Sequence, residues 1–130
     1  MRILAIEDDA LNRRVVRDML SVAGVTLNEA DGAVAGLAMI DGTEFDVILM
    51  DLRMPGMDGL EAIGHIRARP DPKRELPVIV VTADAAASLR DQCLAGGADE
   101  LLLKPVSMED LFEAIGRVIA ARGRPGAMLF

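Results

Sequence analysis

The sequence predicts an α/β protein in which helices cover both faces of a parallel, five-stranded sheet. Short apolar runs alternate with longer amphipathic segments, the pattern of repeated strand–helix units. The run Val78–Val81 is wholly β-branched and the run Val47–Met50 is wholly apolar, as expected for strands buried on both faces. Five strands and five helices in strict alternation predict a doubly wound, three-layer sandwich.

The N-terminal part is expected to contain two strands and two helices. Asp9 is the expected N-cap of the first helix, because its side chain can accept from the free amides of the first turn. Asp31 is expected to cap the second helix, and the second strand is polar enough to be an edge strand. The expected elements are a strand at Arg2–Ile6, a helix from about Ala10 to Ala23 with Leu11, Val15, Met19 and Val22 at helical spacing before the stop at Gly24, a strand at Val25–Ala30, and a helix to about Ile40 that stops at Asp41-Gly42.

The rest of the chain is expected to contain three more strand–helix units. Asp84 is expected to cap the fourth helix, and Ser107 begins the last helix with a Ser-x-x-Asp capping pattern. The expected elements are strands at Asp46–Met50, Val78–Val81 and Leu101–Leu103, a helix marked by Leu60, Ile63 and Ile66 and closed by Pro70 and Pro72, an alanine-rich helix that stops at Gly96-Gly97, and a last helix with Leu111, Phe112, Ile115, Val118 and Ile119 facing inward.

Composition excludes several classes of protein. A chain of 130 residues with 52% hydrophobic and 27% charged residues fits one globular domain. The net charge of −7 argues against a nucleic-acid surface, and no apolar stretch is long enough to span a membrane. The lone Cys93 excludes an internal disulfide and is expected to be a small buried hydrophobe, whereas His65 is expected to be exposed and without a role. The chain is therefore expected to be cytoplasmic.

Reactive side chains stand at the ends of the predicted strands. Glu7 and Asp8 follow the first strand, Asp51 the third, Thr82 the fourth and Lys104 the fifth. A doubly wound fold binds ligands at the carboxyl ends of its strands, so these residues should meet. Two carboxylates ~4 Å apart repel by about 4 kcal/mol at an effective dielectric of 20, so three of them need a cation. Oxygen ligands with waters and a phosphate favour Mg²⁺ or Mn²⁺.

The motifs at these strand ends resemble the receiver domain of two-component response regulators, from Met1 to about Arg122. Each motif is weak alone, but four in this order and spacing are specific. They are Ile-Glu-Asp-Asp at the first strand end, Leu-Met-Asp-Leu-Arg-Met-Pro-Gly-Met-Asp-Gly around Asp51, Val-Val-Thr-Ala at the fourth strand end and Leu-Lys-Pro-Val at the fifth. The resemblance implies a flavodoxin-like (βα)5 fold with strand order 2-1-3-4-5.

The resemblance also implies roles for the residues. Asp51 would be the nucleophile that takes a phosphoryl group from a histidine kinase or a histidine phosphotransfer protein. Asp8, Asp51 and the backbone carbonyl of Arg53 would bind the metal directly, and Glu7 would act through water. The phosphorylated domain would then bind a downstream target protein differently or pass the phosphoryl group on.

Three further residues would contact the phosphoryl oxygens in such a domain. The Lys104 ammonium would neutralise their charge, while the Thr82 hydroxyl and the Ala83 amide would donate to them. Attack of water on the phosphorus would reset the domain, so the chain would catalyse its own phosphorylation and dephosphorylation. The resemblance also implies a cis peptide bond before Pro105.

The sequence departs from the family at Leu101, where members commonly carry Tyr or Phe. Leucine has no ring to move between environments, so we expect a weaker or differently connected conformational change on the face formed by the fourth helix, fifth strand and fifth helix. Arg53 and Asp84 have opposite charges at the mouth of the expected site, and we expect them to pair across the opening.

Several alternatives stay open. Residues 123–130 begin with Gly-Arg-Pro-Gly and are expected to be a tail or the start of a linker after a receiver domain at 1–122, so the receiver could come from a hybrid histidine kinase. A receiver fold that is never phosphorylated is disfavoured, because every chemical position is filled. A hydrolase of the haloacid dehalogenase type would have its nucleophile on the first strand, and a flavin carrier would need a loop rich in Ser and Thr there.

Overall fold

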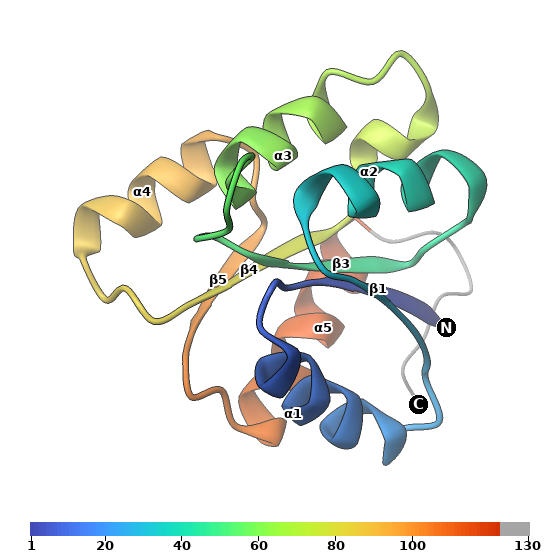
Figure 1. Ribbon diagram of the computed structural model, residues 1–130, viewed down its shortest axis with the longest axis vertical. Helices are drawn as coiled ribbons and strands as arrows, with labels where there is room; N and C mark the ends of the chain where they lie inside the picture. The colour runs from blue at the N-terminus through green and yellow to red at the C-terminus, as the bar shows by residue number, and fades with distance from the viewer. Residues whose placement is uncertain (123–130) are drawn as a thin grey trace.

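Five parallel strands form the middle layer of the protein (Figure 1). This computed structural model describes residues 1–122. The strands are β1 (Arg2–Ile6), β2 (Thr26–Ala30), β3 (Val47–Asp51), β4 (Val78–Thr82) and β5 (Glu100–Leu103). Their order in the sheet is β2-β1-β3-β4-β5, so the direction of winding reverses between β1 and β3. The predicted fold class, the strand order and the edge position of the second strand are confirmed.

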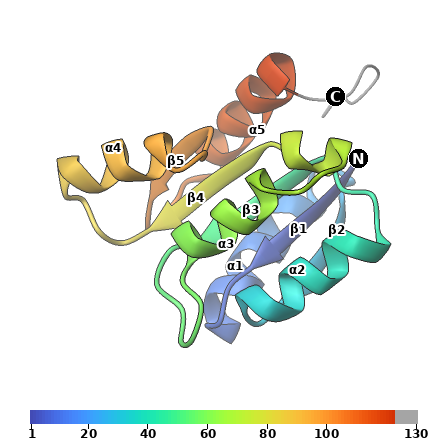
Figure 2. The same ribbon diagram turned by 90° about the horizontal axis from the view of Figure 1, so that it is seen from above.

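Helices cover the two faces of the sheet unequally. They are α1 (Ala10–Ser21), α2 (Ala33–Gly42), α3 (Gly59–Arg67), α4 (Ala87–Ala95) and α5 (Met108–Arg122), with a short 3₁₀ helix, η1 (Pro72–Glu75), between α3 and β4. Figures 1 and 2 show α1 and α5 on one face and α2, α3 and α4 on the other. Each face has its own buried cluster of aliphatic side chains, which fixes the sheet between two apolar layers.

The helix N-termini test the predicted caps. Asp9 accepts hydrogen bonds from the first amides of α1, and the Ser107 hydroxyl accepts from the Asp110 amide at the start of α5, so these two predictions are confirmed. The prediction for Asp31 is wrong, because α2 begins after Gly32 and has no side-chain cap. The prediction for Asp84 is also wrong. Its carboxylate accepts from the Ala86 amide in the turn before α4, so the helix begins two residues later than expected.

Most of the apolar residues that indicated α1 lie outside its buried face, and only Met19 among them packs against the sheet. Leu11 and Val22 are 68% and 71% exposed, whereas Leu20 is fully buried, with Val16 and Met19 packed beside it. The two sets of residues differ by about one position, which rotates the helix by about 100°. The spacing therefore identified the helix correctly but not the side that faces the sheet.

Arg67 is the last residue of α3. It connects several segments by hydrogen bonds at the end of the sheet that lies opposite to the predicted site. Its guanidinium donates to the carbonyl of Gly97 at 3.0 Å and to those of Arg74 and Leu76, both at 2.7 Å. It also donates to the Asp99 carboxylate at 3.0 Å. Five donors in a planar fork allow one arginine to satisfy all these acceptors.

Asp99 extends this network to the last helix. Its carboxylate accepts from the Val78 amide at 2.9 Å and from Arg122 at 2.8 Å, and Arg122 also pairs with Glu75 at 2.6 Å. The network thus joins α3, η1, the starts of β4 and β5, and the end of α5.

Within residues 1–122, no helix combines the length and the apolar character needed to cross a bilayer. The predicted tail at 123–130 lies outside the described residues.

Candidate functional site

The carboxyl ends of β1, β3, β4 and β5 enclose an open cleft of about 480 Å³. Parallel strands end at the same edge of a sheet, so residues far apart in the chain meet there. The cleft contains all seven residues that the sequence predicted for the site. It is lined by Glu7, Asp8, Asp9, Asn12, Asp51, Arg53, Thr82, Ala83, Asp84 and Lys104.

The backbone around Asp51 is fixed from behind by a close approach of α3. Asp51 is the last residue of β3 and is buried. The amide of Gly59 donates to the Leu52 carbonyl at 2.9 Å, and a Cβ at Gly59 would clash with the Asp51 carbonyl oxygen. Asp58 caps α3 by accepting from the Glu61 amide. Glycine is therefore required where the helix starts directly behind the acid.

Glu7, Asp8 and Asp51 form an acidic cluster in the cleft. One carboxylate oxygen from each residue lies within 4.8 Å of the others, and Asp8 is exposed while the other two are buried. Burial raises the pKa of Asp51 to about 6, and the Glu7 carboxylate acts in the same direction, against the opposing effect of Lys104. Three carboxylates at this spacing are a donor set that suits a hard divalent cation.

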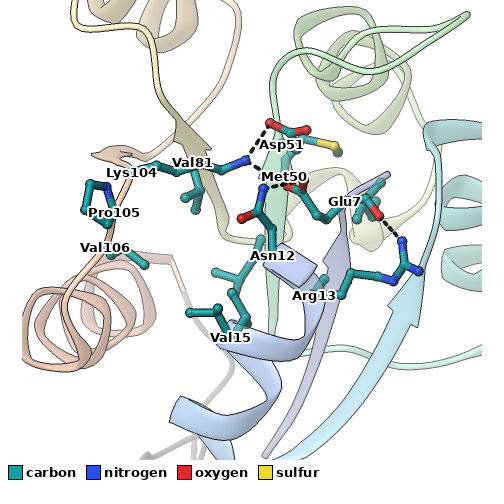
Figure 3. A pocket seen from close by; sticks show the side chains of 14 residues that line it. Glu7, Asn12, Arg13, Val15, Met50, Asp51, Val81, Lys104, Pro105 and Val106 are labelled. Carbon is teal, nitrogen blue, oxygen red and sulfur yellow. Dashed lines mark hydrogen bonds and ion pairs between the residues drawn. The ribbon is translucent and has the colours of Figure 1, made fainter. Parts of the chain in front are cut away.

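Lys104 projects into this cluster from the end of β5 (Figure 3). Its ammonium nitrogen lies 3.1 Å from Glu7 Oε2 and 3.4 Å from Asp51 Oδ1. Burial acts to lower the pKa of Lys104, but the hydrogen bond to Glu7 and the charges of Asp51 and Glu7 outweigh it, so the pKa is raised and the side chain stays charged. The peptide bond between Lys104 and Pro105 is cis, as the resemblance implied.

The far wall of the cleft comes from β4 and the loop after it. Thr82 is buried, and its hydroxyl accepts from the Asp84 amide at 3.2 Å. The Asp84 carboxylate pairs with the Arg53 guanidinium at 2.7 Å, so the predicted ion pair across the opening is present. The hydrogen bond from the Ala86 amide, together with the pair with Arg53, lowers the pKa of Asp84.

Two residues of α1 contact Glu7 although the sequence did not indicate them, and one of them, Asn12, lines the cleft. The Asn12 side-chain amide donates to Glu7 Oε1 at 3.2 Å, and the Arg13 guanidinium donates to the Glu7 carbonyl at 2.7 Å (Figure 3). The sequence could have indicated these two residues by their position, because both lie in the first turn of a helix that directly follows the acidic end of a strand. From there, side chains can reach back to that strand.

A smaller cavity of about 140 Å³ lies next to this cleft, between α1 and the loop after β5. Its walls are mostly aliphatic, from Val15, Val81 and Val106 among others, and Lys104 and Glu7 form its boundary with the acidic cluster. Leu101 is packed in the buried cluster on the face of the sheet that is covered by α2, α3 and α4. The effect of this leucine on conformational change stays a prediction.

Comparison with known proteins supplies the family. Residues 3–116 match the response regulator receiver domain. Response regulator MprA of Mycobacterium leprae is 37% identical over 125 residues, covering 96% of this chain and 53% of that protein. Sensor protein GacS of Pseudomonas syringae pv. syringae is 33% identical over 116 residues, covering 88% of this chain and 13% of that protein. The chain thus spans about half of one curated relative and a small part of the other.

A solved structure shares both the fold and a moderate level of sequence identity. The receiver domain of sensor histidine kinase PA1611 from Pseudomonas aeruginosa PAO1 superposes with a TM-score of 0.83 at 32% identity, covering 92% of this chain and 97% of that one. That structure is described as having a magnesium ion coordinated in its active-site cleft.

Proposed function

This chain belongs to the response regulator receiver domain family of two-component signal transduction, and from that premise we propose that Asp51 accepts a phosphoryl group. The donor is a histidine kinase or a histidine phosphotransfer protein. The single observation that carries the proposal is the shared contact of the Lys104 ammonium with Glu7 and Asp51 inside the acidic cleft. A buried carboxylate beside a fixed cation and further acids is what aspartyl phosphorylation needs.

We propose that Asp8, Asp51 and the backbone carbonyl of Arg53 hold Mg²⁺, with Glu7 acting through water. The cluster fits such an ion, because its three carboxylates offer only oxygen ligands and the exposed Asp8 leaves room for water. The magnesium ion described for the PA1611 receiver domain supports this choice. When bound, the cation offsets the repulsion between the acids and the phosphoryl oxygens. Mn²⁺ would suit the same ligands.

The reaction then depends on residues that already line the cleft. A carboxylate oxygen of Asp51 bonds to phosphorus as the phosphorus–nitrogen bond of the donor phosphohistidine breaks, and the imidazole leaves with that electron pair. Lys104 neutralises phosphoryl charge while it remains within reach of Asp51. The Thr82 hydroxyl and the Ala83 amide donate to the remaining oxygens. Attack of water on the same phosphorus regenerates the carboxylate.

Intact-mass measurement tests the proposed function. We expect the wild-type chain, incubated with Mg²⁺ and acetyl phosphate, to gain one phosphoryl group that is stable in acid and labile in base. The Asp51→Ala variant should gain none, because the acceptor oxygen is missing. Phosphorylation of both proteins would mean another acceptor, and phosphorylation of neither would favour a receiver fold that serves only as a binding module.

Arg53 and Asp84 are expected to affect how long the phosphoryl group survives. Their ion pair closes part of the cleft mouth, although the Arg53 side chain is 71% exposed. Arg53→Ala keeps the backbone carbonyl and removes only the side chain, so loss of phosphate should become about two- to fivefold faster, within the range of an exposed pair. The check is the decay of the phosphorylated mass with time. Arg90→Ala, at an exposed position of α4, is the matched control. Equal rates of phosphate loss in the wild type, Arg53→Ala and Arg90→Ala would contradict the prediction.

The relatives support two settings for such a domain. MprA is a response regulator and GacS is a sensor protein, and the chain matches part of each. In either setting, phosphorylation of Asp51 changes the population of conformations that a downstream target protein binds, or the phosphoryl group passes to a further histidine.

A further inference from the structure

We propose that Asn12 is a positioning residue that holds Glu7 as the partner of Lys104 and keeps it from binding the metal directly. This inference rests on the proposed function, because it assigns a division of labour among the acids of the same cleft. It concerns one side chain of α1 that lines the cleft and whose amide contacts an acid of the cluster.

Both oxygens of the Glu7 carboxylate already have donors. Oε1 accepts from the Asn12 side-chain amide at 3.2 Å and from the Asp9 backbone amide at 3.3 Å. Oε2 accepts from the Lys104 ammonium at 3.1 Å. Hydrogen bonds to a charged carboxylate are stronger than neutral ones, so these three contacts fix the orientation of the group. Asp8, by contrast, is exposed and open to the cleft.

The neighbouring residue fixes the backbone of the same acid. Arg13 donates to the Glu7 carbonyl at 2.7 Å, and its guanidinium lies 3.8 Å from the Glu29 carboxylate on β2. Two consecutive residues of α1 therefore hold the two ends of Glu7, Arg13 at its carbonyl and Asn12 at its carboxylate (Figure 3). This arrangement leaves the Glu7 side chain little freedom as long as the Asn12 amide is present.

The fixed orientation of the Glu7 carboxylate matters because Glu7 and Asp51 both contact the Lys104 ammonium. Its nitrogen is closer to Glu7 than to Asp51, at 3.1 Å against 3.4 Å. When Asp51 becomes an acyl phosphate, its carboxyl group no longer carries a charge, but Glu7 still keeps the ammonium over the cleft, where the anionic phosphoryl oxygens need it. An aspartate at position 7 would be one methylene shorter, so we expect it to lose one of the two contacts that Glu7 makes with Lys104 and Asn12.

The proposal predicts effects of opposite sign on metal affinity and on chemistry. Asn12→Ala removes one of the two donors to Oε1 of Glu7, so a third carboxylate becomes more available to the cation and the affinity for Mg²⁺ should rise about threefold to tenfold. Lys104 then loses its fixed partner, so phosphorylation by acetyl phosphate at saturating Mg²⁺ should slow about threefold to tenfold. Damage to the fold would lower both quantities together.

The experiment is a double-mutant cycle between positions 12 and 7. Wild type, Asn12→Ala, Glu7→Asp and the double variant are compared by NMR titration with Mg²⁺ and by the rate of phosphorylation followed by intact mass. Arg14→Ala is the control on the same helix, since this arginine is 72% exposed and its ion-pair partner is Asp18. Far-ultraviolet circular dichroism checks that each variant is folded, and alanine favours the helix at position 12.

The expected result is tighter Mg²⁺ binding with slower phosphorylation in Asn12→Ala, and little effect of the same change when residue 7 is aspartate. Unchanged or weaker Mg²⁺ binding in Asn12→Ala would overturn the proposal, as would an equal effect in both backgrounds. The Mg²⁺ titration needs no phosphorylation. If the wild type binds Mg²⁺ but takes no phosphoryl group, the proposed function fails while the metal-affinity cycle still decides the role of Asn12.

Discussion

Replacement of Arg67 by alanine should lower the free energy of unfolding by about 3 kcal/mol, because three backbone carbonyls lose the donor that its guanidinium supplies. The variant leaves the carbonyls of Gly97, Arg74 and Leu76 without their guanidinium partner, at a site where the Arg67 side chain is only 18% exposed. Asp99 keeps its bonds from the Val78 amide and from Arg122, so the loss is smaller than for a fully orphaned acid.

Urea denaturation followed by far-ultraviolet circular dichroism measures this effect, since the chain has no Trp or Tyr for fluorescence. The midpoint of thermal unfolding should fall by about 10 °C for a domain of this size. Arg67→Lys should recover little, because one ammonium cannot reproduce the planar fork. Arg74→Ala is the matched control, because its side chain is 57% exposed and its ion pair with Glu75 is long, at 3.9 Å. Similar losses in Arg67→Ala and Arg74→Ala would refute the explanation.

Asp51→Asn should make the metal-free domain more stable, by about 2 kcal/mol at pH 7, although it removes the proposed acceptor. The pKa of Asp51 rises from 3.8 to about 6 on folding, because burial and the Glu7 carboxylate disfavour its charge. Between these two pH values the folded state binds more protons than the unfolded state, so this residue makes stability fall as the pH rises. Above about pH 6 the whole cost is present, and asparagine avoids it.

The measurement is the free energy of unfolding of both proteins from pH 4 to pH 8 in the presence of a chelator. Their difference should be small near pH 4 and should grow to its full size by about pH 7. Addition of Mg²⁺ should stabilise the wild type more than the variant, because a ligand that binds only the folded state adds to its stability. A variant that is less stable than the wild type at pH 7 without metal would contradict the proposed electrostatic cost.

The positions of the site residues could be predicted because the apolar runs of this sequence show where its strands end. Asp51 and Lys104 each follow an apolar run, and a parallel sheet brings such positions together whatever their distance along the chain. The face of α1 could not be predicted, because Leu11 and Val16 both belong to apolar sets with helical spacing. Only the packing against the sheet distinguishes the two faces.

The contacts of polar side chains were the least predictable part. Asp31 and Asp84 have the right residue type for caps, but each lies more than one residue before its helix, and the backbone there forms a turn instead. Arg67 gives no local signal at all, since its partners lie up to 32 residues away and are mainly backbone carbonyls. The contact between Asn12 and Glu7 likewise could not be predicted, because only the folded structure shows that the two side chains meet.

The span between Glu7 and Lys104, 97 residues along the chain, also bears on how the protein is made. While the ribosome is still synthesising β5, the acids of β1 and β3 are already present, but the ammonium that joins them is not. A nascent chain that stops short of this lysine would hold the proposed acceptor carboxylate of Asp51 without the ammonium that contacts it. The acidic cleft therefore gains its cation only after residue 104 has been synthesised.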